Sequence, residues 1–139
     1  RCILLCQHKL ELNNIRLEQH IGDRLPDING DFNQLQQCII NLVFNSADAM
    51  PQGGTLTLTA SYVESRHAVH LTVSDTGTGI SEKDLPHIFE PFYTTKDEGY
   101  GVGLGLSTLY GILQDHQGSV QVESEPGKET SFTLSLPVP

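Results

Sequence analysis

An aspartate at the end of an apolar run, Asp75 in the stretch VSDTGTGI (73–80), is the first residue whose surroundings could support chemistry. Asp-Thr-Gly after strand-forming residues is typical of an aspartic protease half-site, where two carboxylates share one proton. The same residues suit a nucleotide pocket, because a carboxylate can accept from the exocyclic amine of a base and nearby glycines let a flat ring approach the backbone. The tripeptide alone leaves both interpretations open.

A second group of polar residues is spaced for one stripe of a helix. Asn41, Asn45 and Asp48 follow one another at intervals of four and three residues. Asparagine is a poor helix former, so two in one stripe need a reason. Either the stripe is a solvated face, which Gln34 and Gln37 would continue, or its oxygens are ligands for Mg²⁺.

The third group is the stretch GYGVGLGL (99–106), with glycine at every second position. It matches neither the dinucleotide fingerprint nor a P-loop. Glycines that lead directly into a helix can present backbone N–H groups to an anion, and Lys96 could add a positive charge for a polyphosphate. The alternative is a hinge that binds no ligand.

The elements that position these groups can be predicted from periodicity. We expect a weak helix over 2–12, a strand over 15–21, and a long helix over 31–50 that begins at Asp31, with Gln34 completing a capping box. A hairpin should follow over 55–75. We expect a short helix or turn capped by Ser81, a loop over 93–103, a helix over 104–116 stopped by Gly118, and two final strands.

Strand parity then predicts which side chains share a face. The inward set of the hairpin should include Tyr62 on its first strand and Asp75 on its second, and Thr130 should face inward on the last strand. The expected fold is α+β, a two-layer α/β sandwich whose mixed, mostly antiparallel sheet carries its helices on one face.

Composition narrows the function. The 139 residues suit one domain, and 17 acidic against 8 basic side chains give a net charge of −9, which argues against nucleic acid as a partner. The three cysteines form no CxxC pair, which favours a reducing compartment. No apolar run approaches the ~18 residues of a membrane span, so we expect no membrane contact. Arg1 in place of a methionine suggests a fragment of a longer protein.

Taken together, these motifs resemble the ATP-binding catalytic domain of sensor histidine kinases, which has the Bergerat fold. Residues 31–50 resemble the family's N box, DTGTGI (75–80) its first glycine box, FEPFYTTK (89–96) its F box, and GVGLGL (101–106) its second glycine box. PGKETSF (126–132) resembles a third glycine box. The resemblance covers the chain from about residue 15 to its end.

The resemblance implies a role for each matching residue. Asn45 would coordinate the Mg²⁺ that bridges the phosphates of ATP, Asn41 would line the same pocket, Asp75 would accept from the adenine amine, and Thr130 would bind the adenine edge through water. The other implied contacts are with adenine (Gly77, Gly79 and Ile80), with a short lid (Thr94, Thr95 and Lys96) and with the phosphates (Gly101, Gly103, Leu104, Gly105 and Leu106). No catalytic residue follows with certainty, although Lys96 is a candidate phosphate contact.

The sequence departs from the family pattern at Ser46, where alanine is usual, at Val102, where threonine or serine is more frequent, and at Glu129, which replaces a glycine. None of the six histidines precedes an acidic residue, as the family's phosphoacceptor usually does. The resemblance therefore implies a catalytic domain without its acceptor, with residues 1–14 as a candidate linker helix.

By the same resemblance, the partners are a histidine-bearing dimerisation domain of the same parent protein and a downstream response regulator. The isolated domain would be a monomer, the parent a homodimer, and the location cytoplasmic, including the cytoplasmic part of a membrane-bound sensor. Two rivals remain on this fold, a hydrolytic ATPase and a nucleotide-binding module without catalysis. ATPases of this fold carry a general-base glutamate where this chain has Asn41.

Overall fold

The structure is a computed structural model that describes residues 10–22, 30–50, 52–80, 83, 85–89, 105–125 and 127–138. Within these residues it contains five strands, two long helices and two short 3₁₀ turns. In chain order they are β1 (Ile15–Ile21), α2 (Phe32–Asp48), β2 (Gly54–Val63), η1 (Glu64–Arg66), β3 (Ala68–Asp75), η2 (Leu85–His87), α3 (Gly105–Asp115), β4 (Ser119–Glu125) and β5 (Glu129–Pro137).

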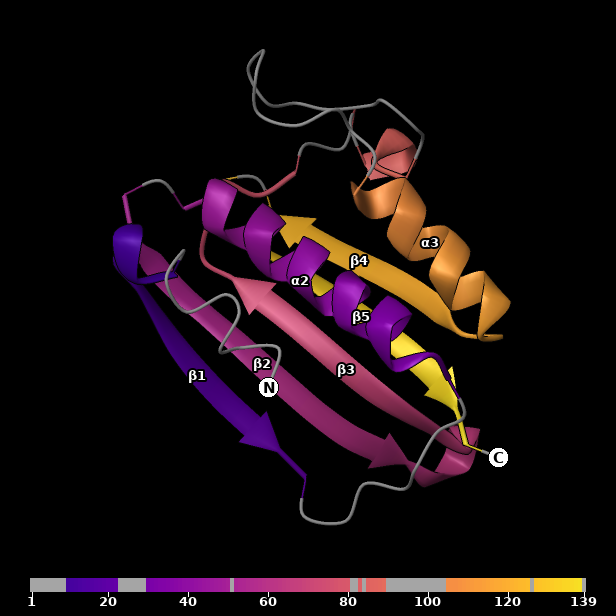
Figure 1. The fold of residues 1–139 in the computed structure, drawn as a ribbon. Helices are drawn as coiled ribbons and strands as arrows, with labels where there is room; N and C mark the ends of the chain where they lie inside the picture. Colours follow the sequence, from indigo (N-terminus) through magenta and orange to yellow (C-terminus); the bar gives the residue numbers. More distant parts are fainter. Residues whose placement is uncertain are drawn as a thin grey trace.

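The strands form one twisted sheet in the order β1-β2-β3-β5-β4. β1 runs parallel to β2, and the other neighbours are antiparallel. Figure 1 shows α2 and α3 lying across the same face of this sheet. The predicted α+β two-layer architecture, with a mixed and mostly antiparallel sheet, is confirmed.

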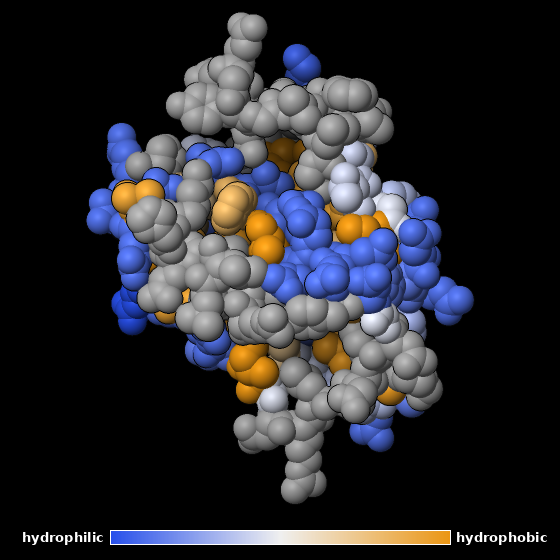
Figure 2. Space-filling view, in the orientation of Figure 1, coloured by the Kyte–Doolittle hydropathy of each residue, from blue (hydrophilic) through white to orange (hydrophobic). Residues whose placement is uncertain are grey.

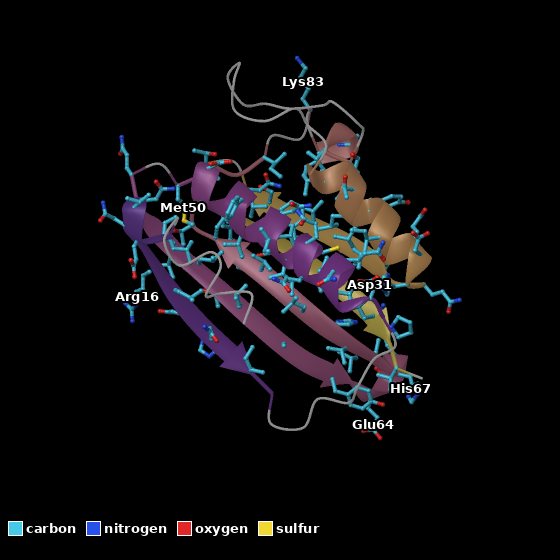
Figure 3. All side chains as sticks on the ribbon, viewed as in Figure 1. Arg16, Asp31, Met50, Glu64, His67 and Lys83 are labelled. Carbon is cyan, nitrogen blue, oxygen red and sulfur yellow. The ribbon has the colours of Figure 1, made fainter. Side chains whose placement is uncertain are left out.

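α2 begins where its capping residue predicts. The Asp31 side chain accepts from the Gln34 backbone N–H at 3.1 Å, which satisfies one of the unpaired donors at the start of the helix. The inward face of α2 is then apolar, with Cys38, Leu42 and Val43 fully buried. Asp31 and Met50 mark the two ends of this segment in Figure 3. The cap and the apolar face together explain why this 17-residue stretch is a helix rather than a strand.

α3 packs beside α2 and completes the helical layer. Leu109 and Leu113 are buried, and the Cys38 thiol of α2 lies 4.0 Å from the Leu109 carbonyl oxygen. The helix ends at Asp115, and Gln117 takes a left-handed conformation with φ 59°. The helix therefore ends close to the predicted stop, but Gln117 and not Gly118 takes the left-handed conformation, while the Gly118 N–H returns to the Leu113 carbonyl at 2.7 Å.

The two faces of the sheet differ in chemistry, as alternation predicts. The face under the helices carries buried apolar residues, including Leu56, Val73 and Phe132. The opposite face carries hydroxyls that pair between strands, such as Ser74 with Ser131 at 2.8 Å. The outer side of the helical layer is hydrophilic, and Figure 2 shows hydrophilic residues gathered across the middle of this view. One core therefore lies between the helices and the sheet.

Some predictions fail or cannot be compared. Tyr62 lies on the predicted face but is exposed, because it is beyond the helices, at the hairpin end marked by Glu64 and His67 in Figure 3. Its hydroxyl is 3.1 Å from Nδ1 of His67. The short helix or turn expected over 81–89 is present among the described residues as η2. Ser81 itself, the loop over 93–103 and most of the helix over 2–12 lie outside the described residues. No described helix is long and apolar enough to cross a membrane.

Candidate functional site

Three polar side chains are buried within the described part of the chain, and they lie together. Ser46 of α2, Asp75 of β3 and Thr130 of β5 are 2%, 4% and 4% exposed. Asp75 and Thr130 are direct partners in the antiparallel β3–β5 pair, and the Ser46 hydroxyl hydrogen-bonds to the Asp75 carboxylate. Buried polar groups need partners and rarely gather by chance, so this cluster is the candidate site.

Asp75 is an acceptor held in a fixed orientation. One carboxylate oxygen accepts from the Gly77 backbone N–H at 2.9 Å. Burial raises the pKa of Asp75 above the ordinary aspartate value, while the Gly77 N–H and the Ser46 hydroxyl oppose that rise and the negative charge of Glu129 adds to it. The carboxylate is therefore desolvated but partly compensated, which leaves lone pairs free for a ligand that donates hydrogen bonds.

Thr130 belongs to a second hydrogen-bond network centred on Ser124 of β4. The two hydroxyl oxygens are 2.9 Å apart, and these residues face each other in the β4–β5 pair. Ser124 Oγ also accepts from the Ile80 N–H at 2.6 Å and donates to the Glu129 carbonyl at 2.9 Å. Asp75, Thr130 and Ser124 thus form one row across three adjacent strands.

The loop after β3, residues 76–80, is tied down by backbone contacts. The Thr78 N–H donates to the Ala49 carbonyl at the end of α2, and the Thr78 carbonyl accepts from the Gly127 N–H at 2.7 Å. A Cβ on Gly77 would lie 2.6 Å from that Ala49 oxygen, so only glycine fits. Gly79 has φ 74°, which glycine adopts without strain. These contacts hold the loop against both the helix and the sheet.

The asparagine stripe leads along α2 toward this cluster. Asn41, Asn45 and Asp48 are all partly exposed. The Asn41 side-chain oxygen accepts from the Gln37 side chain at 2.8 Å. Asn45 directly precedes the buried Ser46, so it lies where the buried pocket meets the solvated face of the helix. The described residues contain no group of three or more His, Cys, Asp or Glu that could hold a metal alone.

The candidate ligand for a metal ion at this position is the amide oxygen of Asn45. An amide oxygen such as that of Asn45, supplemented by phosphate oxygens and water, is a donor set that Mg²⁺ accepts. The oxygen chemistry of the stripe fits Mg²⁺ and does not fit a softer metal that prefers sulfur or imidazole.

The structure brings together only part of the predicted site. Asp75 and Thr130 belong to the buried cluster, and the 76–80 loop that carries Gly77, Gly79 and Ile80 adjoins it. The two asparagines lie on the adjoining helix α2. Gly105 opens α3, and Leu106 is partly buried against the core. The other predicted contacts lie outside the described residues: Thr94, Thr95, Lys96, Gly101, Gly103 and Leu104.

Three contributors to the site were not predicted. Ser124 continues the inward parity of Val120 and Val122, so a polar residue at the end of an apolar face was an available signal. Ser46 is a small departure from the family pattern, and the sequence does not indicate that its hydroxyl hydrogen-bonds to Asp75. The Ala49 carbonyl had no signal, because any residue presents the same backbone oxygen.

Sequence comparison identifies relatives over nearly the whole chain. Residues 30–139 match the family model described as histidine kinase-, DNA gyrase B-, and HSP90-like ATPase. Sporulation kinase A of Bacillus subtilis is 49% identical over 96% of this chain and 21% of its own length. Sensor histidine kinase ZraS of Escherichia coli K12 is 40% identical over 96% of this chain and 30% of its own length. The chain thus spans less than a third of these relatives.

Solved structures agree. Full-length ShkA in complex with AMPPNP superposes with a TM-score of 0.86 at 28% identity, covering 98% of this chain and 28% of that one. The catalytic domain of histidine kinase ThkA, in a nucleotide-free form, gives a TM-score of 0.85 at 28% identity and covers 98% of this chain and 87% of that one. The chain therefore belongs to the family of histidine kinase-, DNA gyrase B- and HSP90-like ATPases, within which it is an ATP-binding catalytic domain of the histidine kinase type.

Proposed function

We propose that this domain binds Mg²⁺-ATP and transfers the γ-phosphoryl group to a histidine on a separate dimerisation domain of its parent protein. The observation that carries the proposal is the buried cluster of Ser46, Asp75 and Thr130 beside a conformationally restricted glycine loop. A buried carboxylate with free lone pairs is costly unless a ligand uses it. The 6-amino group of adenine supplies the matching donor.

The adenine ring would lie against the 76–80 loop. Gly77 and Gly79 bring the backbone close without side chains, and Ile80 offers an apolar surface on the same loop. Asp75 would accept from the amine at one edge of the ring, and Thr130 would contact that edge through water. The base would thus be fixed by the sheet, and the phosphates would extend toward the open side of α2.

At the phosphate end, Asn45 would contribute an oxygen ligand and Asn41 would line the same space. Mg²⁺, when bound, neutralises phosphate charge and orients the transferring group. The net charge of −9 repels a polyphosphate, so local compensation is needed. Backbone N–H groups at the start of α3 and the predicted contacts of the 94–104 segment would complete that compensation.

A histidine is a better phosphoryl acceptor than water for this domain, because the general-base glutamate of hydrolytic relatives is replaced by Asn41. Asn41 occupies the position where hydrolytic relatives carry a glutamate, and its oxygen already accepts from the Gln37 side chain. A neutral amide cannot take a proton from water near pH 7, so the domain would not activate water efficiently. An imidazole presented by another domain needs no such base, because its neutral nitrogen is already nucleophilic.

The wider assignments are parts of the same proposal. Residues 1–14 would link this domain to the dimerisation domain, the parent would be a cytoplasmic or membrane-tethered homodimer, and a response regulator would receive the phosphoryl group. The relatives named above are sensor and sporulation kinases much longer than this chain, which supports a multidomain parent. The isolated domain would be a monomer.

A transfer assay tests the proposal. The domain is incubated with γ-labelled ATP and magnesium, alone and with the dimerisation domain of its parent. We expect label on the dimerisation domain only when both are present, stable in base and lost in acid, as a phosphoramidate is. Label on the domain alone, acid-stable label on serine or threonine, or rapid release of free phosphate would contradict it.

A further inference from the structure

We propose that Ser124 is a specificity-determining residue: it makes Thr130 an obligate hydrogen-bond acceptor toward the ligand and so selects 6-aminopurine over 6-oxopurine nucleotides. This inference rests on the proposed ATP site but adds a residue and a rule to it. Ser124 would not touch the base; it would act through the hydroxyl of Thr130.

The first step concerns the single hydrogen of the Ser124 hydroxyl. Ser124 Oγ lies 2.9 Å from the Glu129 carbonyl oxygen, which can only accept. That contact therefore uses the Ser124 hydrogen. Ser124 Oγ also accepts from the Ile80 N–H at 2.6 Å. One donor and one acceptor function of Ser124 are thus committed to backbone groups.

The second step fixes the hydroxyl of Thr130. Thr130 Oγ1 lies 2.9 Å from Ser124 Oγ, and only one of the two oxygens can supply the hydrogen between them. Since the Ser124 hydrogen points to Glu129, the hydrogen must come from Thr130. Thr130 is 4% exposed, so bulk water does not compete for it. The remaining lone pairs of Thr130 Oγ1 can only accept.

The third step combines Thr130 with its strand neighbour. Asp75 lies directly across the β3–β5 pair from Thr130, and an ionised carboxylate also only accepts. The two residues together present acceptors and no donor to the ligand. A 6-amino group has two hydrogens to give to them, directly or through a water. A 6-oxo group would set an acceptor against acceptors and leave them unpaired, which discriminates strongly between ligands of the same shape.

The direction in which the Thr130 hydroxyl donates depends on Ser124. In Ser124→Ala, the Thr130 hydroxyl loses its acceptor and can rotate toward the ligand as a donor. A 6-oxo group would then find a donor, and the penalty against it would fall. Affinity for a 6-aminopurine nucleotide should fall less, because the Thr130 lone pairs and the Asp75 carboxylate remain.

The test compares the affinities of ATP and inosine triphosphate, which differ at the 6-position and the adjacent ring nitrogen. Calorimetry at pH 8 with magnesium gives both dissociation constants for the parent and for Ser124→Ala. We expect the parent to prefer ATP by on the order of 100-fold or more, and Ser124→Ala to reduce this preference by on the order of tenfold. If the ratio of the two dissociation constants in Ser124→Ala stays within about twofold of the parental ratio, the inference is overturned.

Ser131→Ala is the matched control. Ser131 neighbours Thr130 on β5 but faces the other side of the sheet, where its hydroxyl pairs with Ser74 at 2.8 Å. Its removal deletes a serine hydroxyl from the same strand and should leave the preference at the parental value. An equal loss of preference in Ser131→Ala would show a general effect of weakening the sheet and would overturn the role of Ser124.

A double variant separates positioning from structure. Thr130→Val removes the hydroxyl that Ser124 is proposed to orient, so adding Ser124→Ala to it should change the preference no further. An additional loss in the double variant would contradict action through Thr130.

If Ser124→Ala does not fold, Ser124→Cys retains a side chain with a weak donor and acceptor and should lower the preference by a smaller factor. A parent that binds neither nucleotide would refute the ATP site itself, a result distinct from binding without the predicted change.

Discussion

The imidazole of His116 joins the end of α3 to the start of α2: its Nε2 accepts from the Asp31 backbone N–H at 2.9 Å, across 85 positions of sequence. The other ring nitrogen, Nδ1, donates to the Ile112 carbonyl at 2.8 Å. Both bonds together require the neutral ring with its hydrogen on Nδ1. The ring therefore satisfies the Asp31 N–H at the start of α2 and joins it to the last turn of α3, where the Ile112 carbonyl also accepts from the His116 backbone N–H.

His116→Ala should destabilise the domain by about 1–2 kcal/mol, because it removes both bonds and leaves the Asp31 N–H without its partner. The free energy of unfolding, measured in urea, checks this. Gln114→Ala on the exposed side of the same helix is the control and should change stability little. Equal values for the two variants would mean that the His116 bridge contributes nothing.

Gly77→Ala and Gly111→Ala should shift stability in opposite directions. A Cβ on Gly77 would lie 2.6 Å from the Ala49 carbonyl oxygen, whereas one on Gly111 would meet nothing within 4 Å. We expect Gly77→Ala to cost about 1–3 kcal/mol through overpacking and Gly111→Ala, in the exposed interior of α3, to add about 0.5–1 kcal/mol. Urea unfolding of both variants decides, and a stable Gly77→Ala would show that the loop can move away from α2.

Asp75→Asn should separate binding from stability. The amide has one acceptor oxygen in place of two and can turn its NH₂ toward the adenine amine, so ATP affinity should fall by on the order of 2 kcal/mol, about thirtyfold. The unfolding free energy should not fall, because a desolvated charge is removed. Calorimetry and urea unfolding of the same sample measure both quantities. Unchanged ATP affinity would remove Asp75 from the adenine contact.

The stability of the ligand-free domain should carry a pH signature of Asp75. Burial raises the folded pKa of this carboxyl, so the native state retains its proton where the unfolded state, with a pKa of about 4, has lost it. The contribution of Asp75 to stability therefore falls as pH rises from about 4 through the raised value. The stability of Asp75→Asn relative to the parent should increase over that interval. A difference that does not vary with pH would contradict a raised pKa.

Asn45→Ala should reduce the effect of magnesium on nucleotide affinity while affecting weakly the affinity for adenosine, which carries no phosphate. The metal requires oxygen ligands and the base does not. Titrating magnesium at fixed ATP, with adenosine as the reference ligand, measures both. The exposed Asn33, near the start of the same helix, provides Asn33→Ala as a control. A full magnesium effect in Asn45→Ala would exclude Asn45 as a ligand.

The predictable part of this fold is the part governed by local rules. The capping side chain of Asp31 determines where α2 begins. A period of two predicts that Asp75 and Thr130 share one face, and their pairing between β3 and β5 confirms it. Tyr62 obeys the same period but is exposed, because alternation specifies a face and not how far the helices cover it. Coverage depends on tertiary packing, which no single strand encodes.

The residues expected to contact the ligand could be predicted from the sequence, but the groups that hold those residues in place could not. The carboxylate and the glycines carry a sequence pattern, but the Ala49 carbonyl and the three bonds of Ser124 depend on segments that meet only in the folded chain. A serine at the end of a strand is common and does not by itself indicate a function. Which groups it donates to and accepts from is known only when the positions of all its neighbours are known.

The 76–80 loop touches the end of α2, the β4 strand and the turn before β5, so the base pocket exists only when elements from both halves of the chain have docked. No shorter segment could retain adenine affinity by itself. A bound nucleotide would therefore stabilise the whole domain, by RT ln(1 + [L]/Kd). It would reduce global unfolding rather than local fraying at the ends of helices and strands. In a cell, a change in nucleotide concentration would then also change how long the domain resists proteolysis.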